Sequence, residues 1–427
     1  MNNTTGINNG VEMNNEIEMN FDIGRSGLRT YDGKLRFTVA DPAYKKIPAD
    51  SFIRHDIKDP YTDFKILMCP KEELKGVRIV KGQAMSLFNA TIEQADNGGQ
   101  KSEQEETFVN FIYATMMELV ERLHTDVEDP EIKYGLCIPV SEAYSSKSDE
   151  LKDALDGRYM VNIPILKKSI SWSVHSDNIN ILPEGPAAMI PLFDNDEYAE
   201  LIENEMGIII DAGYGSVDDT LIKDGETQGA TATSDGFGGM TFENNVMSLL
   251  DRKSYPASKG NVKTAITKGF VKKGTVNDPV GIIVKECKEK YADKLKSDVL
   301  SLISTEFVRQ AELSWFYPIG RSFTKSTGED AFNTGDLSKI FSDKWGYEIR
   351  ELEKPELPEG SYCIDRTSFT KDIKNNEELE SHSELYKVRV PDINELANVY
   401  GIGCALCGED DDDEENEESE QLVTTME

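Results

Sequence analysis

The sequence lacks the segments that mark secreted and membrane-spanning proteins. No apolar run approaches the roughly 20 residues of a membrane-spanning helix, and the chain does not open with the charged-then-apolar pattern of a signal peptide. We therefore expect a soluble, cytoplasmic protein with no membrane partner. The first residues, 1–16, are rich in asparagine and glycine and are predicted to form a disordered tail.

Cysteine is also scarce, with six residues among 427. Only Cys404 and Cys407 lie close together, as one C-x-x-C pair. A single pair without a partner pair does not give the ligand set of a zinc site, and this one lacks the flanking residues of a redox motif. Reduced thiols on a terminal helix are the simpler interpretation.

Basic residues are few relative to acidic ones, 46 against 79, so the formal net charge is −33. The run Glu409–Glu420, with Glu427, supplies 11 acidic groups and no basic one, which leaves −22 for the rest. Such a surface repels nucleic acid and anionic lipid, so we expect any DNA role to run through a basic partner. The acidic tail at 409–427 is predicted to be disordered. It is either solvated and without a role or a segment whose repulsion limits close association between copies of the chain.

What the chain does contain is a pair of aspartate-headed glycine hairpins. Residues 206–224, MGIIIDAGYGSVDDTLIKD, join an apolar run to Asp211, a glycine turn and a second apolar pair. Residues 17–31, IEMNFDIGRSGLRTY, repeat the pattern around Asp22. Each predicts a strand, a glycine turn and a strand, with a carboxylate at the mouth and backbone N–H groups facing an anion.

This combination favours a site for a nucleoside triphosphate and its metal. Phosphoryl transfer needs phosphate oxygens held, Mg²⁺ placed and a water in line. Mg²⁺ keeps several waters and takes few carboxylates, a role that suits Asp22 and Asp211. Arg29 would neutralise phosphate charge, and Glu184 would orient or activate the attacking water, with Asp211 as the second catalytic residue. The cofactor-binding residues predicted in the two turns are Gly24, Arg25, Ser26, Gly27, Gly213, Tyr214, Gly215, Ser216 and Asp218.

Other segments fit around these hairpins. Gly238 and Gly239 precede apolar residues at helical spacing, which aims a helix N-terminus at a ligand. Residues 105–124 have the spacing of a long amphipathic helix, and 281–310 form a second helical stretch. Residues 255–275 are basic for so acidic a chain and are predicted to be helical.

With these motifs the chain resembles the actin-fold ATPases, and among them the ParM-type plasmid-segregation filament proteins. Residues 22–29 resemble the first phosphate motif of the family and residues 211–218 the second. Residues 183–188 resemble the segment that carries the water-positioning side chain. Segments 135–140 and 394–401 suggest the ParM-like subset.

The nucleotide-contacting residues outside the hairpins follow from the same resemblance. Residues 238–242 resemble the glycine pair at the nucleotide and assign Gly238, Gly239 and Met240 to it. Residues 315–323 lie where the adenosine motif belongs and assign Gly320, Arg321 and Ser322 to it. Arg25 stands where a small hydroxyl residue is usual, and Gly320 and Arg321 replace paired glycines, so the choice between ATP and GTP stays open.

The resemblance implies an α/β protein with the actin-like (ribonuclease H-like) two-domain fold and the nucleotide between the domains. The predicted divisions are a tail at 1–16, domain I at 17–183 with an inserted subdomain at about 45–100, domain II at 184–389 with an insert at about 361–386, a C-terminal helix at 390–408 that returns to domain I, and the acidic tail at 409–427.

The implied activity is equally concrete. ATP (or GTP) with Mg²⁺ would drive assembly into a homopolymeric filament, and hydrolysis would destabilise it. A small DNA-binding adaptor at a centromere-like site would link the filament to plasmid or phage DNA, with no direct nucleic-acid binding by this chain. Three alternatives remain from the sequence: a small-molecule kinase on the same fold, a seventy-kilodalton heat-shock type chaperone, and a non-enzymatic acidic scaffold.

Overall fold

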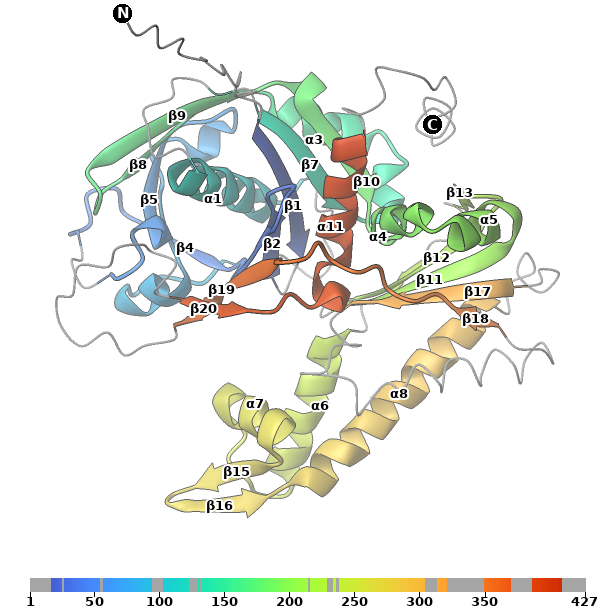
Figure 1. Cartoon of the computed structure of the whole chain (residues 1–427). Helices are drawn as coiled ribbons and strands as arrows, with labels where there is room; N and C mark the ends of the chain where they lie inside the picture. Colours follow the sequence, from blue (N-terminus) through green and yellow to red (C-terminus); the bar gives the residue numbers. More distant parts are fainter. Residues whose placement is uncertain are drawn as a thin grey trace, which may run out of the picture.

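The molecule has two halves, each built on a large sheet (Figure 1). The computed structural model describes residues 17–24, 27–53, 57–93, 103–122, 130, 132–213, 216–228, 233–235, 238–303, 313–320, 349–369 and 386–408.

The first half is built on a seven-stranded sheet in the order β10-β7-β1-β2-β3-β19-β20. Its strands are β1 (Ile17–Gly24), β2 (Gly27–Tyr31), β3 (Arg36–Ala40), β7 (Ile132–Ile138), β10 (Ile179–Pro183), β19 (Tyr362–Phe369) and β20 (Tyr386–Arg389). β1, β7 and β10 are parallel, so their carboxyl ends lie at one edge of the sheet. The predicted hairpin and meander at the start of the chain are confirmed.

Strand β19 differs from the sequence-based expectation of an insert at about 361–386. It pairs in parallel with β3, from Tyr362 opposite Arg36 to Asp365 opposite Val39. Residues 362–369 are therefore part of the main sheet of the first half. Their charged composition hid the strand, because Arg366 is buried only through ion pairs with residues far away in the sequence.

A five-stranded antiparallel sheet covers the other side of the first half. It contains β4 (Tyr44–Ile47), β5 (Asp63–Met68), β6 (Arg78–Lys81), β8 (Gly157–Ile163) and β9 (Lys168–Val174). The strands at 44–81 thus pair with strands well beyond the stretch predicted as a subdomain. Helices α2 (Val140–Ala143) and α3 (Lys147–Leu155) follow β7.

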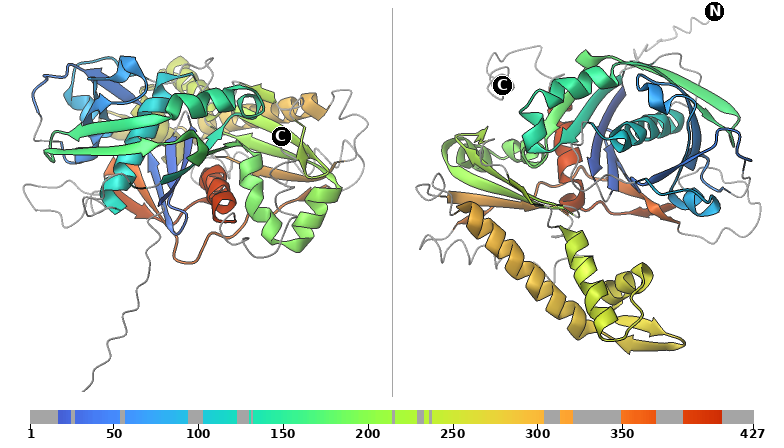
Figure 2. Two further views of the ribbon diagram at one scale, coloured as in Figure 1. Left: turned by 90° about the horizontal axis from the view of Figure 1, so that it is seen from above. Right: turned by 180° about the vertical axis from the view of Figure 1, so that it is seen from behind.

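Helix α1 (Glu105–Arg122) runs between these two sheets (Figures 1 and 2). The predicted helix is confirmed. It does not have the solvent-exposed face expected of an amphipathic helix, because every residue from 106 to 119 is buried. Sheets on both sides leave no solvent-facing stripe. Polar side chains on this helix make hydrogen bonds to neighbouring strands, as in the bond from Thr30 Oγ1 to Glu118 Oε1 (3.1 Å).

The second half has a smaller sheet with helices on both faces. Its strands are β11 (Met206–Ala212), β12 (Val217–Lys223), β13 (Glu226–Thr227), β14 (Thr233–Asp235), β17 (Leu313–Ile319) and β18 (Arg350–Glu351). Ile208 and Ile210 pack toward α6 (Gly239–Arg252) and α8 (Gly281–Ile303), whereas Ile209 packs on the opposite face with α4 (Pro186–Met189) and α5 (Asp196–Asn204). Both apolar strand predictions, at 208–210 and 315–319, are confirmed.

A small lobe lies at the far ends of α6 and α8 (Figure 1). It holds α7 (Lys259–Lys268) and the hairpin β15 (Phe270–Lys273)–β16 (Val276–Pro279). Ser258 caps α7, and Gly269, with φ +70, ends it. The helix predicted over 255–275 is therefore correct for 259–268 only, because the left-handed glycine turns the chain into a strand.

Helix α11 (Ile393–Gly408) passes between the two halves (Figure 1). Its Gly401 lies so close to α4 that an added Cβ would be 1.8 Å from the Ala187 carbonyl oxygen. Cys404 on α11 is a free thiol. Among the described helices, none combines the length and apolar character needed to cross a bilayer.

Candidate functional site

The first aspartate hairpin places an ion pair at the end of β1. In the β1–β2 register Asp22 lies opposite Arg29, and Gly24 lies opposite Gly27. Arg29 Nη1 donates to Asp22 Oδ2 (2.9 Å) and to the Gly27 carbonyl (3.3 Å), and both charged side chains are buried. An added Cβ on Gly24 would lie 2.7 Å from Arg29 Nη1, so the glycine makes room for the guanidinium.

In the second hairpin the residue opposite the aspartate is another acid instead of an arginine. Asp211 lies opposite Asp218 in the β11–β12 register, and Asp218 Oδ2 accepts a hydrogen bond from Ser216 Oγ (2.8 Å). Burial, followed by the charge of Asp218, raises the pKa of Asp211 to about 6. A carboxylate that is buried beside other acids is one that a cation would stabilise.

The two hairpins act on each other across the halves of the molecule. The charge of Asp22 raises the pKa of Asp211, and Arg29 lowers it. In turn, burial opposes the charge on Arg29, but Asp22, Glu395 and Asp211 together hold its pKa above the ordinary value. The carboxylates of residues 22 and 211 therefore belong to one electrostatic cluster, at the carboxyl ends of β1 and β11.

A residue that sequence reasoning missed joins this cluster to a third segment. Asn398 on α11 donates from Nδ2 to Asp211 Oδ2 (3.0 Å), and its Oδ1 accepts from the Gly185 backbone N–H (2.9 Å). Asn398 is the one amide among residues 396–406 of an otherwise largely apolar helix. That isolated polar position was the available signal, but its partners lie 187 and 213 residues away.

Glu184 immediately precedes Gly185, the residue whose N–H binds the Asn398 side chain. It follows β10, and its backbone N–H donates to the Ile138 carbonyl at the end of β7 (2.8 Å). Its side chain is 9% exposed. Gly185 adopts φ +85, a conformation that favours glycine, and starts α4. Two hydrogen bonds through Asn398 thus link the Glu184–Gly185 turn to Asp211.

Two more predicted segments reach the second hairpin. The Gly239 N–H donates to the Gly213 carbonyl (3.1 Å), so α6, with Met240 in its first turn, begins against the hairpin. Gly320 has φ +100, and an added Cβ there would lie 2.6 Å from Asp211 Oδ1 and from the Ala212 backbone. Its N–H donates to the Asn394 carbonyl on α11 (3.0 Å).

Comparison with known structures decides the fold. A ParM non-polymerisable quadruple mutant designated pCBH matches 92% of this chain and 99% of its own length, with a TM-score of 0.59 and 14% identity. Actin-like protein Alp7A matches with a TM-score of 0.61, 15% identity and coverage of 92% and 97%. Ta0583, an archaeal actin homolog, matches in its ADP complex with a TM-score of 0.59, 13% identity and coverage of 92% and 99%.

The chain has the actin-like fold. This confirms the fold class expected from the sequence, over nearly the whole length of the chain. No protein-family model matches the chain, and no curated protein matches it by sequence. The likeness therefore lies in the backbone arrangement, and the chemistry must be argued from the residues.

In this actin-like arrangement most of the predicted site residues converge. Asp22, Gly24, Gly27 and Arg29 come from the first hairpin and face Asp211, Gly213, Ser216 and Asp218 of the second. Gly238, Gly239, Met240 and Gly320 adjoin the second hairpin, and Glu184 is linked to Asp211 through its neighbour Gly185 and Asn398. Arg25, Ser26, Tyr214, Gly215, Arg321 and Ser322 lie outside the described residues.

The residues present fit an Mg²⁺–nucleotide ligand. Burial, and then the charge of Asp218, raises the pKa of Asp211, and a divalent cation would stabilise the charged form of this carboxylate. Gly213 leaves the turn uncrowded, since an added Cβ would lie 3.2 Å from the Ser216 carbonyl oxygen. Oxygen ligands, few in number, are what Mg²⁺ prefers.

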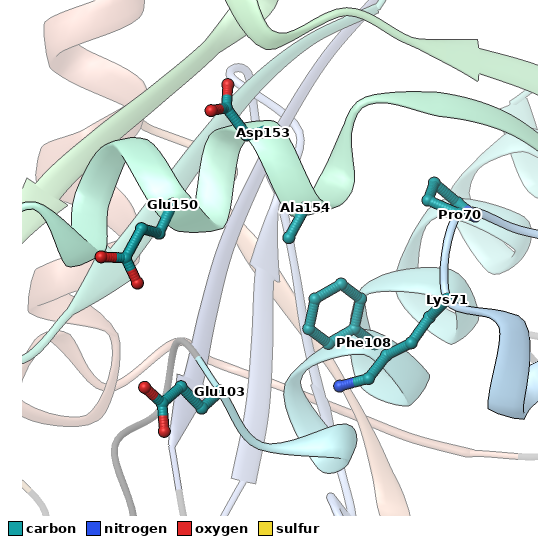
Figure 3. Close-up of a pocket in the computed structure, with 7 residues that line it drawn as sticks. All are labelled: Pro70, Lys71, Glu103, Phe108, Glu150, Asp153 and Ala154. Carbon is teal, nitrogen blue, oxygen red and sulfur yellow. The ribbon is translucent and has the colours of Figure 1, made fainter.

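A pocket of about 510 Å³ lies elsewhere, between α1, α3 and the residues that follow β5 (Figure 3). Lys71 and Phe108 line one side, with the ammonium 4.1 Å from the ring centroid, and Glu150 and Asp153 line the other. None of the predicted site residues borders it. The pocket is therefore separate from the two aspartate hairpins.

Proposed function

We propose that this chain is a nucleotide-dependent, polymerising ATPase whose filaments segregate plasmid or phage DNA through a DNA-binding adaptor. The observation that carries the proposal is the electrostatic coupling of Asp22 and Arg29 with Asp211 across the two halves. An acidic, glycine-lined meeting point between two sheets suits a triphosphate and its metal, because both halves contribute ligands.

Each residue has a proposed role. Asp22 and Asp211 hold Mg²⁺, which supplies charge neutralisation for the phosphates when bound. The glycine turns at 24–27 and 213–216 present N–H groups to phosphate oxygens, and Arg29 balances their charge. Glu184 orients the attacking water, and Asn398 fixes the position of Asp211 relative to Glu184. Residues 238–240 and 320–322 border the nucleoside.

Related structures support the nucleotide and the filament. One archaeal actin homolog is known in complex with ADP, a Bacillus thuringiensis ParM is known with AMPPNP, and a ParM from Clostridium botulinum forms a 15-stranded filament. The body charge of −22 supports DNA contact through an adaptor instead of direct binding. We further propose that the domains divide near residue 183 and that α11 returns to domain I, as do β19 and β20, which the sequence assigned to domain II but which pair in the sheet of the first half.

The test is sedimentation and electron microscopy of the purified chain with ATP, with GTP and without nucleotide. We expect a nucleotide-dependent pellet made of filaments. Glu184→Ala should bind nucleotide and assemble, with turnover lowered about 100-fold, roughly 2.7 kcal/mol in the barrier, so that polymer persists. Glu150→Ala, on exposed α3, is the matched control and should behave as wild type. Absence of any pellet at every nucleotide and protein concentration would refute the proposal.

A further inference from the structure

The lobe at the end of α6 and α8 has a charge opposite to that of the rest of the chain. Residues 252–280, which we call the basic lobe, contain seven basic side chains and one acidic one, Asp278. Their formal charge is +6, in a body whose total is −22. No residue proposed for the nucleotide site lies in this segment, so the function proposed above does not account for it.

The charges of the basic lobe face solvent. Its aliphatic side chains, among them Val262, Ala265 and Val271, join the core of the second half and hold the lobe in place. The basic side chains whose exposure the structure describes are all exposed: Arg252, Lys253, Lys263, Lys268, Lys272 and Lys273. Figures 1 and 2 show the lobe projecting away from the body. Clustered like charges repel one another, so binding of an anion to this surface would be favourable.

The densest anion in the chain is its own C-terminal segment. Residues 409–420 carry ten acidic side chains and no basic one. This segment leaves from the end of α11, which packs along β1, and the charges of Asp194 and of Glu18, at the start of β1, act on the half-buried Cys404 of this helix. The segment is therefore attached at the end of the molecule where β1 begins.

The basic lobe is at the opposite end. Helix α6 begins at Gly239 beside the nucleotide site and runs away from it for 14 residues, about 21 Å, before the lobe is reached. Helix α11 begins beside the same site, at Asn394, and runs back past β1 and β7. The basic lobe and the carboxyl end of α11, to which the acidic segment is attached, thus lie in opposite directions from the site (Figure 1).

From this arrangement we propose that the basic lobe of one copy binds the acidic segment 409–420 of the next copy. The inference rests on the polymerisation proposed above and names a contact that would drive it. Because the lobe and the attachment point of the tail lie at opposite ends of one copy, we propose a head-to-tail contact that repeats without closing, as a filament requires. Opposite charge accelerates such association, and salt weakens it.

Binding is measured first without any polymer. A fluorescent peptide of residues 409–427 is titrated with the chain truncated at 408, without nucleotide, and followed by anisotropy. We expect saturable binding at 50 mM KCl and at least tenfold weaker binding at 300 mM. The lobe variant Lys268→Glu, Lys272→Glu and Lys273→Glu should lose at least tenfold. A peptide with every acid changed to its amide should not bind.

A matched control reverses three exposed lysines outside the lobe, Lys34→Glu, Lys223→Glu and Lys387→Glu, and should bind the peptide within twofold of the parent. Equal losses in the lobe and control variants would overturn the proposal, because general charge would then explain the binding. Tighter binding of a DNA duplex of equal charge at the lobe would overturn it as well, in favour of a nucleic-acid partner.

Sedimentation with nucleotide then tests the contact in the assembly. Removing residues 409–427 should raise the protein concentration needed for pelleting at least fivefold at 50 mM KCl. More pelleting after truncation would contradict the contact and would show a repulsive tail instead. If the full chain never pellets but the peptide binds the lobe, the filament proposal fails and the contact stands. If the chain pellets and the peptide does not bind, the contact alone fails.

Discussion

The two halves of the molecule bury charge in different ways. In the first half, Arg78 makes a bidentate pair with Asp63 (2.8 and 2.7 Å), and Arg366 pairs with Asp59 (3.4 Å) and Glu121. Within the described residues of the second half, all the ion pairs seen are exposed, such as Arg350 with Glu197 (2.5 Å). Its cores are mainly aliphatic and aromatic.

The two aspartate hairpins differ in the same way, in whether their buried acid has a basic partner. Asp22 forms an ion pair with Arg29 on the adjacent strand, so the charge of the first acid is balanced within its own hairpin. Asp211 accepts a hydrogen bond from the side-chain amide of Asn398, and burial, followed by the negative charge of Asp218, raises its pKa. The second acid therefore depends on Asn398 of α11, outside its own sheet, and lies opposite an acid instead of a basic partner in its own strand pair, so we expect it to be the more sensitive of the two to ligand. Substitutions at both hairpins and at the buried ion pairs test this contrast.

The largest effect is expected where a buried arginine loses its acid. Asp63→Ala leaves Arg78, which is 2% exposed, without a carboxylate and should lower the free energy of unfolding by about 3–5 kcal/mol. Glu197→Ala removes an acid from the exposed pair with Arg350 and should leave the free energy of unfolding nearly unchanged, because water screens exposed ion pairs. Urea denaturation of both variants measures the difference, and equal losses would erase the contrast between the halves.

The second prediction separates the two aspartates. Asp211→Asn removes charge from an acid whose pKa burial has already raised, so stability should change by less than about 1 kcal/mol while ATP turnover falls about 100-fold. Asp22→Asn breaks the pair with buried Arg29 and should also cost about 2–3 kcal/mol of stability. Denaturation and turnover assays on both variants decide it. Equal destabilisation would show that the hairpins are equivalent.

The third prediction uses the buried lysine of the first half. Lys81 Nζ donates to Asn110 Oδ1 (2.7 Å) and to the Pro42 carbonyl (2.9 Å), and burial lowers the pKa of Lys81 to about 7. The unfolded chain holds this proton up to about pH 10, so between pH 7 and 10 folding releases it. Stability should therefore rise with pH in that window, by about 2 kcal/mol from pH 7 to 9.

Lys81→Met should remove that rise, and the exposed Lys46→Met on β4 should keep it. The measurement is the denaturation midpoint of the three proteins at pH 7 and pH 9. Parallel pH dependence in Lys81→Met and wild type would assign the rise to other groups.

The smallest effect is expected at the amide between the halves. Asn398→Ala removes the hydrogen bonds to Asp211 and to the Gly185 N–H, so ATP turnover should fall about tenfold, near 1.4 kcal/mol, with KM changed less than twofold. Cys404→Ala on the same helix is the control and should keep wild-type turnover. A change in KM alone would show that Asn398 supports binding and does not position Asp211.

The sequence could predict what depends on neighbours along the chain. The two hairpins, the helix start at Gly238–Gly239 and the apolar strand at 315–319 follow from local spacing, and the structure has each of them. Partners far apart in sequence were out of reach. Asn398 meets Asp211 across 187 residues, and Arg366 meets Asp59 across 307, so neither pairing left a local pattern. The burial of Arg366, like the strand β19 that carries it, depends on those distant acids.

The parallel pairing of β19 with β3 also has a consequence for biosynthesis. The buried Asp59 and the partly buried Glu121 are translated long before Arg366, with Glu121 preceding its partner by 245 residues. At about 5–20 residues per second, a ribosome needs about 10–50 s to cover that interval. During this time the nascent first half lacks both the penultimate strand of its main sheet and the cation that neutralises its interior. We expect the amino-terminal half to reach its native state only once translation has passed the β19 codons.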